Sequence, residues 1–265
     1  MDLTQRVQQK LDSVEIEKGI HIVFACEVGS LAWGKPSLDS DYDVRFIYLY
    51  NSKTDKKPAH IETPITTQWD LAGFEASRAI QYVGESNPSM VEWFASPMRY
   101  RTSALGEQLG KRLQELFSPE RYLCAYRGLF KKLLKKLKNP VIQPKIYLLL
   151  LRFLMTCRWT LVQKTIPPFT FRELAHEYLP SSLHSIVTEL WALKEQHTKS
   201  FVIPHIQRLD EYLLPEIDFI LQTIESLKDV IVAPHSPQEV LNLKDFLIGS
   251  EVWKECSTYG HKTQD

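Results

Sequence analysis

Two acidic side chains in the first fifth of the chain have the type and spacing of a divalent-metal site. Asp41 and Asp43 stand two residues apart, where a polar turn runs into the strand-like segment 44–49. Because side chains alternate along a strand, both carboxylates and Arg45 are predicted to project from one face. Neighbouring carboxylates repel each other, and Mg²⁺ completed by phosphate oxygens supplies the missing counter-charge. The pair therefore indicates phosphoryl or nucleotidyl transfer; the alternative is an ordinary Asp-rich turn.

A Gly-Ser pair precedes these carboxylates by about ten residues. The apolar run 20–26 predicts a buried strand, which Gly29 and Ser30 end. Residues 31–33 are predicted to form a short helix with Ser30 as its N-cap. Free N–H groups at a helix start can bind a phosphate group. A phosphate-binding turn beside paired carboxylates favours the transfer chemistry over the turn.

Several motifs together resemble a bacterial and phage branch of the polymerase-beta-type nucleotidyltransferases, a branch associated with RNA repair. The similarity extends over about residues 20–165. One difference stands beside the Gly-Ser pair, where Leu31 replaces the arginine usual in that family. The motifs that carry the resemblance are Gly29-Ser30, Ala32-Trp33-Gly34, Ser40-Asp41-Tyr42-Asp43-Val44-Arg45, Ser86-Asn87-Pro88, Glu92-Trp93, Ser96-Pro97 and Cys157-Arg158-Trp159.

The resemblance implies a metal-dependent enzyme that moves a nucleoside monophosphate from an NTP to a hydroxyl acceptor. It implies that Asp41 and Asp43 hold Mg²⁺ or Mn²⁺ on the triphosphate, and that Gly29 and Ser30 bind the β- and γ-phosphates. Enzymes of this type carry a third carboxylate on a neighbouring strand, which the resemblance assigns to Asp70, at the end of a strand predicted over 61–71. The alternative is that Asp70 caps a helix beginning near Gly73.

The order of predicted elements indicates an α+β protein. Helix, strand, short helix, two strands and further helices follow one another up to residue 117, which favours a small mixed sheet with helices on one face. From residue 118 the pattern is almost entirely helical. We therefore expect a nucleotidyltransferase domain over 1–117 and a helical domain over 118–265, which covers its cleft.

Positive charge gathers on one predicted helix of the second domain. The chain has 32 basic and 32 acidic residues, so its formal net charge is zero. A nucleic acid would therefore have to bind a local patch of positive charge. The segment 127–138 is such a patch and could contact RNA, although it could equally be a solvated helix face. Arg152 and Arg158 lie in the apolar helix predicted over 145–163. Each is expected to pair with an acidic neighbour or to face a substrate phosphate.

The N-terminus and the most apolar run of the sequence restrict where the protein can be located. The N-terminus lacks the apolar segment of a signal peptide, and the most apolar run, 146–155, is too short to span a bilayer, so a cytoplasmic protein without a membrane partner is expected. The expected partners are an NTP and an RNA end. Two alternatives stay open: transfer of AMP to a protein hydroxyl, as in nucleotidyltransferase-type antitoxins, and a nucleotide-binding regulator without turnover.

Overall fold

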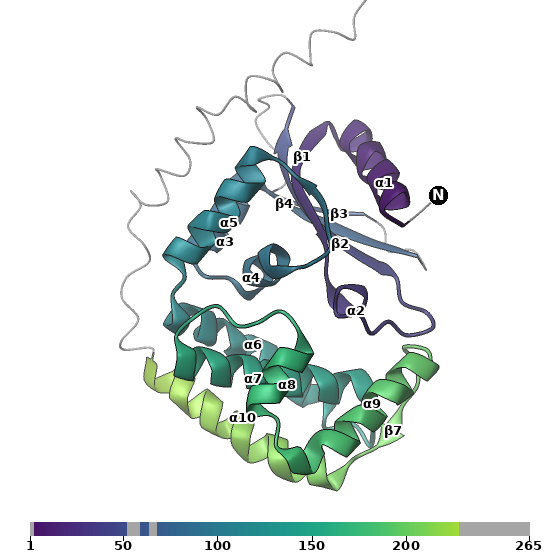
Figure 1. Cartoon of the computed structure of the whole chain (residues 1–265), viewed down its shortest axis with the longest axis vertical. Coiled ribbons are helices and arrows are strands. Elements are labelled where there is room, and N and C mark those ends of the chain that lie inside the picture. The colour runs from purple at the N-terminus through teal and green to yellow at the C-terminus, as the bar shows by residue number, and fades with distance from the viewer. Residues whose placement is uncertain (1–2, 52–58, 64–67, 228–265) are drawn as a thin grey trace, which may run out of the picture.

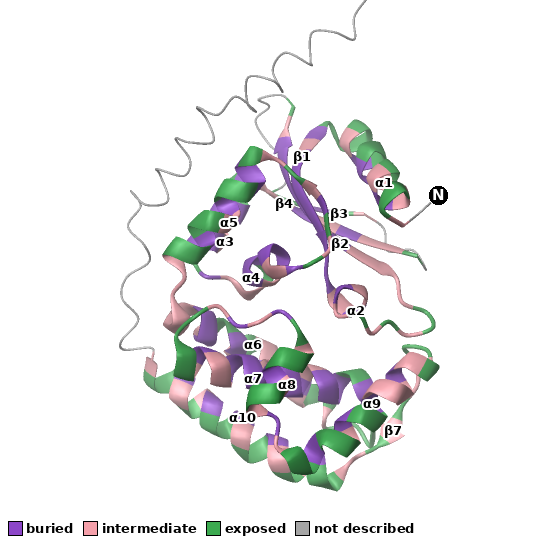
Figure 2. Cartoon of the chain, viewed as in Figure 1, coloured by how far each residue is buried: buried purple, intermediate pink, exposed green. Residues whose placement is uncertain are grey.

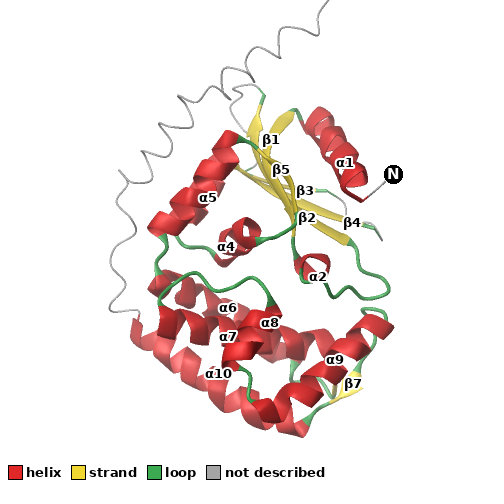
Figure 3. Ribbon diagram, in the orientation of Figure 1, coloured by secondary structure: helices red, strands yellow, loops and turns green. Residues whose placement is uncertain are grey.

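The computed structural model describes residues 3–51, 59–63 and 68–227. A mixed sheet and the helices around it form one half of the molecule, and a bundle of helices forms the other (Figure 1). The short helix α2 (Gly29–Ala32) lies at the edge of the sheet that faces the bundle (Figure 3). The predicted α+β class is confirmed.

The sheet has five strands in the order β3-β4-β2-β1-β5. The central strand β2 pairs with β1 in the antiparallel sense and with β4 in the parallel sense. This parallel pair places equivalent ends of β2 and β4 side by side, next to α2. The strands span Ile20–Glu27 (β1), Tyr42–Tyr50 (β2), His60–Glu62 (β3), Trp69–Glu75 (β4) and Arg99–Thr102 (β5).

Helices cover both faces of the sheet, so the prediction of helices on one face is wrong. One face packs against α1 (Leu3–Lys18), whose Val7, Leu11 and Val14 belong to one buried apolar cluster with Ile22 and Phe46. The other face packs against three helices (Figure 2). These are α3 (Ala76–Gly84), α4 (Pro88–Ala95) and α5 (Ala104–Leu116).

The single strand predicted over 61–71 is also wrong. Its ends belong to two strands, β3 and β4, and β4 runs on to Glu75. Gly73 lies inside β4, where a Cβ atom would stand 2.3 Å from the ring of Phe46. The glycine that resembles a helix start in the sequence is therefore a packing site, and helix α3 begins only at Ala76, capped by Glu75.

The helical half is built around α7. This helix packs against α6, α8, α9 and α10, so the prediction of a central helix is confirmed. A two-stranded sheet, β6 (Val141–Ile142) and β7 (Ile203–Pro204), closes one end of the bundle. The helices span Pro119–Lys136 (α6), Pro144–Gln163 (α7), Phe171–Tyr178 (α8), His184–Gln196 (α9) and Gln207–Leu227 (α10).

Among the described residues, α7 alone is long and apolar enough to cross a membrane by length and composition. Its most apolar stretch is 56% buried by the surrounding helices, which accounts for that composition within a folded bundle. The predicted boundary at 117/118 falls between α5 and α6, and one apolar cluster runs across it. Part of the predicted second domain, 228–265, lies outside the described residues.

Candidate active site

The sheet brings the three predicted carboxylates together. In the parallel pairing of β2 and β4, Asp43 stands directly opposite Asp70, and Asp41 immediately precedes β2. One oxygen from each carboxylate lies within 4.8 Å of the others, and all three side chains are half-buried. Asp70 is the second residue of β4, not the last of a strand, and the alternative of a helix cap is wrong. Hard carboxylate oxygens at this spacing suit Mg²⁺ or Mn²⁺.

Arg45 supplies part of the counter-charge. Its guanidinium donates to both carboxylate oxygens of Asp70, at 2.9 and 3.3 Å, and to the Asp70 carbonyl at 2.9 Å. The same group lies 3.7 Å from Asp43. Arg45 therefore holds the carboxylates of β2 and β4 in one arrangement.

The acidic cluster remains electrostatically strained despite this arginine. Burial, followed by the charge of Asp41, raises the pKa of Asp43 to about 6. Glu27, at the end of β1, is fully buried; burial raises its pKa to about 7. The Glu27 carboxylate accepts from the Asp43 backbone N–H at 2.6 Å and from the Tyr100 hydroxyl at 2.8 Å. It thus fixes the start of β2, and a divalent cation would offset the repulsion there.

Gly29 and Ser30 lie beside the carboxylates. Gly29 has φ +69°, and a Cβ atom there would stand 2.4 Å from an Asp43 carboxylate oxygen, so only glycine permits this approach. Ser30 is not an N-cap, because α2 begins at Gly29, two residues earlier than predicted, and Val28 takes the N-cap position. Its hydroxyl instead lies 3.2 Å from that of Ser40, which links α2 to the turn before β2.

A cavity of about 340 Å³ opens beside this cluster, between the sheet and the bundle. Asp43 and Arg45 line it from β2, Gly29 lines it from α2, and Arg152 lines it from α7. Arg152 is buried, with its guanidinium 4.7 Å from the centre of the Trp33 ring. Among the described residues, neither Arg152 Nη1 nor Trp33 Nε1 has a hydrogen-bond partner. Two buried donors without an acceptor suit an anionic ligand.

Arg158 is not brought to this cavity. It forms an ion pair with Glu216 of α10 and lies over the ring of Phe219. Each arginine of this helix is expected from the sequence to pair with an acidic neighbour or to face a substrate phosphate. Arg158 has an acidic partner, whereas the structure describes none for Arg152.

Comparison with known proteins agrees with this geometry. A family model described as "RNA repair pathway DNA polymerase beta family" matches residues 3–248. The chain belongs to that family. It is also 30% identical over 264 residues to an uncharacterized protein, YcgL, of Bacillus subtilis (strain 168), covering 96% of this chain and 99% of that protein. The suspected relationship to RNA-repair nucleotidyltransferases is therefore confirmed, and the match spans both the sheet and the bundle.

Two motifs of this RNA-repair family member have structural roles. Asn87 caps α4 through its side chain, with Pro88 at the first helical position. The buried Ser96 hydroxyl donates to the Glu27 carbonyl at 2.6 Å, which ties the end of α4 to the end of β1. Asn87 therefore fixes the start of α4, and Ser96 fixes the position of α4 against the sheet.

Two further residues near the cluster had no signal in the sequence. Lys199 Nζ lies 2.5 Å from an Asp41 carboxylate oxygen, and its backbone N–H donates to Asp39 at 2.9 Å. Lys145 of α7 lines the cavity from the side opposite the sheet. Both come from the helical half, more than a hundred residues from Asp41, where no local spacing indicates a contact. Glu27 could have been noticed as a carboxylate ending an apolar strand.

Proposed function

We propose that the protein transfers a nucleoside monophosphate from an NTP to the hydroxyl group of an RNA end. Asp41, Asp43 and Asp70 would hold Mg²⁺ or Mn²⁺. The proposal rests above all on the three carboxylate oxygens within 4.8 Å beside a cavity with unpaired cationic donors. Membership of the RNA repair pathway family supports RNA as the acceptor.

In the proposed reaction the acceptor hydroxyl oxygen bonds to the α-phosphorus of the NTP. The bond from that phosphorus to the α–β bridging oxygen breaks, so pyrophosphate leaves, and the hydroxyl proton passes to solvent. Bound metal ions would lower the pKa of the hydroxyl and neutralise charge on the phosphates. Gly29 and Ser30 are expected to contact the β- and γ-phosphates, and Arg45 to keep Asp43 and Asp70 in register.

Arg152 has a defined role in this proposal. The family resemblance expects an arginine at position 31, where this chain has leucine. Arg152 brings a buried guanidinium over Trp33, into the cavity that Gly29 also lines. Arg152 and the Trp33 indole would then donate to the triphosphate. This replacement favours an active enzyme over a regulator that has lost turnover.

The test is incubation with each α-labelled NTP, Mg²⁺ or Mn²⁺, and total small RNA. We expect label that ribonuclease removes and protease does not. The reverse pattern would favour the protein-acceptor alternative. An Asp41→Asn variant is the control, and absence of label with all four NTPs and both metals would contradict the proposal.

A further inference from the structure

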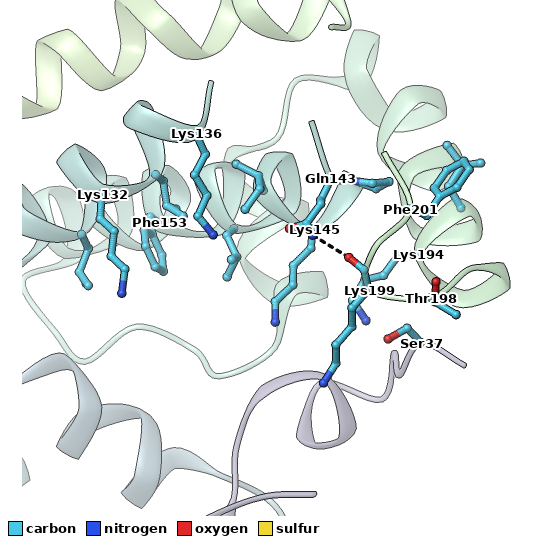
Figure 4. Close-up of a pocket in the computed structure, with 16 residues that line it drawn as sticks. Ser37, Lys132, Lys136, Gln143, Lys145, Phe153, Lys194, Thr198, Lys199 and Phe201 are labelled. Atoms are coloured by element: carbon cyan, nitrogen blue, oxygen red, sulfur yellow. Dashed lines mark hydrogen bonds between the residues drawn. The ribbon is translucent and has the colours of Figure 1, made fainter. Parts of the chain in front are cut away.

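A second cavity, of about 430 Å³, lies next to the first and is lined by five lysines. Figure 4 shows these lysines on α6, at the start of α7, near the end of α9 and on the loop that follows it. No acidic residue stands among the described residues that line it. We call this cavity the lysine pocket, after Lys132, Lys136, Lys145, Lys194 and Lys199. A chain with 32 basic and 32 acidic residues thus concentrates positive charge here.

Three of the five ammonium groups have no direct ion-pair or hydrogen-bond partner among the described residues. Lys199 has an ion pair with Asp41, but the structure describes no hydrogen bond or ion pair for the ammonium groups of Lys132, Lys136 or Lys145. Lys194 is buried and donates to the Lys35 carbonyl. Burial, followed by the charge of Lys145, lowers its pKa to about 8. Like charges held together cost free energy, which a polyanion in the pocket would recover.

The lysine pocket adjoins the cavity beside the carboxylates. Both are lined by Leu129, Lys145, Leu149 and Phe153. Lys199, which lines the lysine pocket from the loop after α9, forms an ion pair with Asp41. A ligand in the lysine pocket would therefore lie directly beside an NTP bound at the carboxylates.

We infer that the lysine pocket binds the backbone phosphates of a single-stranded RNA acceptor, next to the hydroxyl that receives the nucleotide. The inference rests on the proposed function for its acceptor. Several cations spread over three helices match a chain of phosphates, whereas a protein hydroxyl needs none of them. Phe153 and Phe201 add aromatic surface to the lining, on which unpaired bases can stack.

The structure divides the lysines of the predicted basic helix into two sets. All four lysines are exposed, but only Lys132 and Lys136 line the pocket; Lys131 and Lys135 do not. The predicted basic segment 127–138 therefore has one edge that faces the pocket. This division provides two double variants with the same change of charge on the same helix: Lys132→Glu with Lys136→Glu, and Lys131→Glu with Lys135→Glu.

The experiment measures binding of a labelled single-stranded RNA by fluorescence anisotropy, in EDTA and without NTP, over a range of salt concentrations. The pocket variant should bind at least about tenfold more weakly near 0.1 M salt, and its salt slope should fall by about 1.4, or 0.7 for each lost phosphate contact. The control variant should bind within about threefold of the wild type, since screened charges away from the ligand act weakly. Lys132→Gln with Lys136→Gln should give a smaller loss in the same direction.

Equal loss in the two Glu variants would overturn the inference, because the helix would then act only through its overall charge. Unchanged RNA binding in the pocket variant would overturn it too. If that variant instead lost affinity for ATP while keeping RNA, the pocket would belong to the triphosphate. Because no transfer is measured, a failure of the proposed activity is seen separately, in the labelling assay.

Discussion

The two adjoining cavities are built in different ways. The cavity beside the three carboxylates, here called the carboxylate cavity, adjoins residues from the turn before β2 and from two neighbouring strands, where the register of β2 against β4 sets Asp43 opposite Asp70. The lysine pocket takes its residues from three helices and a loop, whose positions depend on side-chain packing. A sheet register fixes positions through backbone hydrogen bonds, whereas a helix bundle can adjust. We expect the first cavity to carry the chemistry and the second to carry acceptor binding.

The largest difference between the cavities should follow removal of one carboxylate. Asp43→Asn should lower transfer at least about 10³-fold, since metal ions supply several kcal/mol of transition-state stabilisation. RNA binding in EDTA should stay unchanged. Transfer is measured with labelled NTP, and RNA binding is measured by fluorescence anisotropy. If the variant lost both, the assignment of chemistry to one cavity and acceptor binding to the other would be wrong.

The same variant tests the electrostatic strain. Folding raises the pKa of Asp43 to about 6, so its ionised form is penalised in the folded protein. This penalty is absent below the ordinary pKa of an aspartate, grows up to pH 6 and is complete above it. At pH 7.5 without metal, Asp43→Asn should therefore raise the Tm by roughly 2–6 °C. A fall in Tm would instead mark Asp43 as a structural residue.

Arg152 offers the next comparison. Arg152→Met should weaken NTP binding by about 10- to 100-fold, because a charged donor to phosphate is lost. Trp33→Phe keeps an aromatic ring at this position but removes the Nε1–H donor together with part of the indole, and a smaller loss of about three- to tenfold is expected. Titration with a fluorescent NTP measures both. Unchanged affinity in both variants would place the triphosphate elsewhere in the cavity.

The carboxylates could be predicted from the sequence because they follow local patterns of residues. Strand alternation predicts that Asp41 and Asp43 share a face, and the family resemblance adds Asp70 from the neighbouring strand. The position of Asp70 within its strand was still wrong, because Gly73 resembles a break in the sequence whereas in the fold it makes room for Phe46.

No comparable sequence pattern predicts the lysine pocket. The basic character of α6 is visible in the sequence, but which of its lysines face the pocket depends on how α6 packs against α7 and α10. Lys145, Lys194 and Lys199 join them only through tertiary contacts, among them the Gln143 side chain donating to the Lys199 carbonyl at 2.7 Å. No spacing along one chain segment encodes such contacts.

Metal should affect the ligands of the two cavities differently. NTP at about 100 times its Kd should add roughly 2.7 kcal/mol of stability, a rise of about 5–10 °C in Tm, with Mg²⁺, and much less with EDTA. RNA should give the same shift in both conditions, because its contacts are to lysines. Thermal melts in the four conditions measure this. Equal NTP shifts with Mg²⁺ and EDTA would argue against a metal site completed by phosphates.

The smallest expected effect concerns the protonation of Lys194. Its pKa is lowered to about 8, first by burial and then by Lys145 and Lys199, against the opposing charges of Glu195 and Asp39. A bound phosphate chain favours the ammonium form, so binding must draw in a proton once the free protein has lost it. Affinity should thus be highest below pH 8 and fall by about three- to tenfold by pH 9.

An RNA of adenosine alone keeps base titration out of the measurement. Lys194→Gln should bind more weakly at pH 7 and lose this pH dependence, whereas Lys131→Gln should retain it. A wild-type affinity that stayed constant from pH 7 to 9 would show that the Lys194 ammonium does not face the bound RNA.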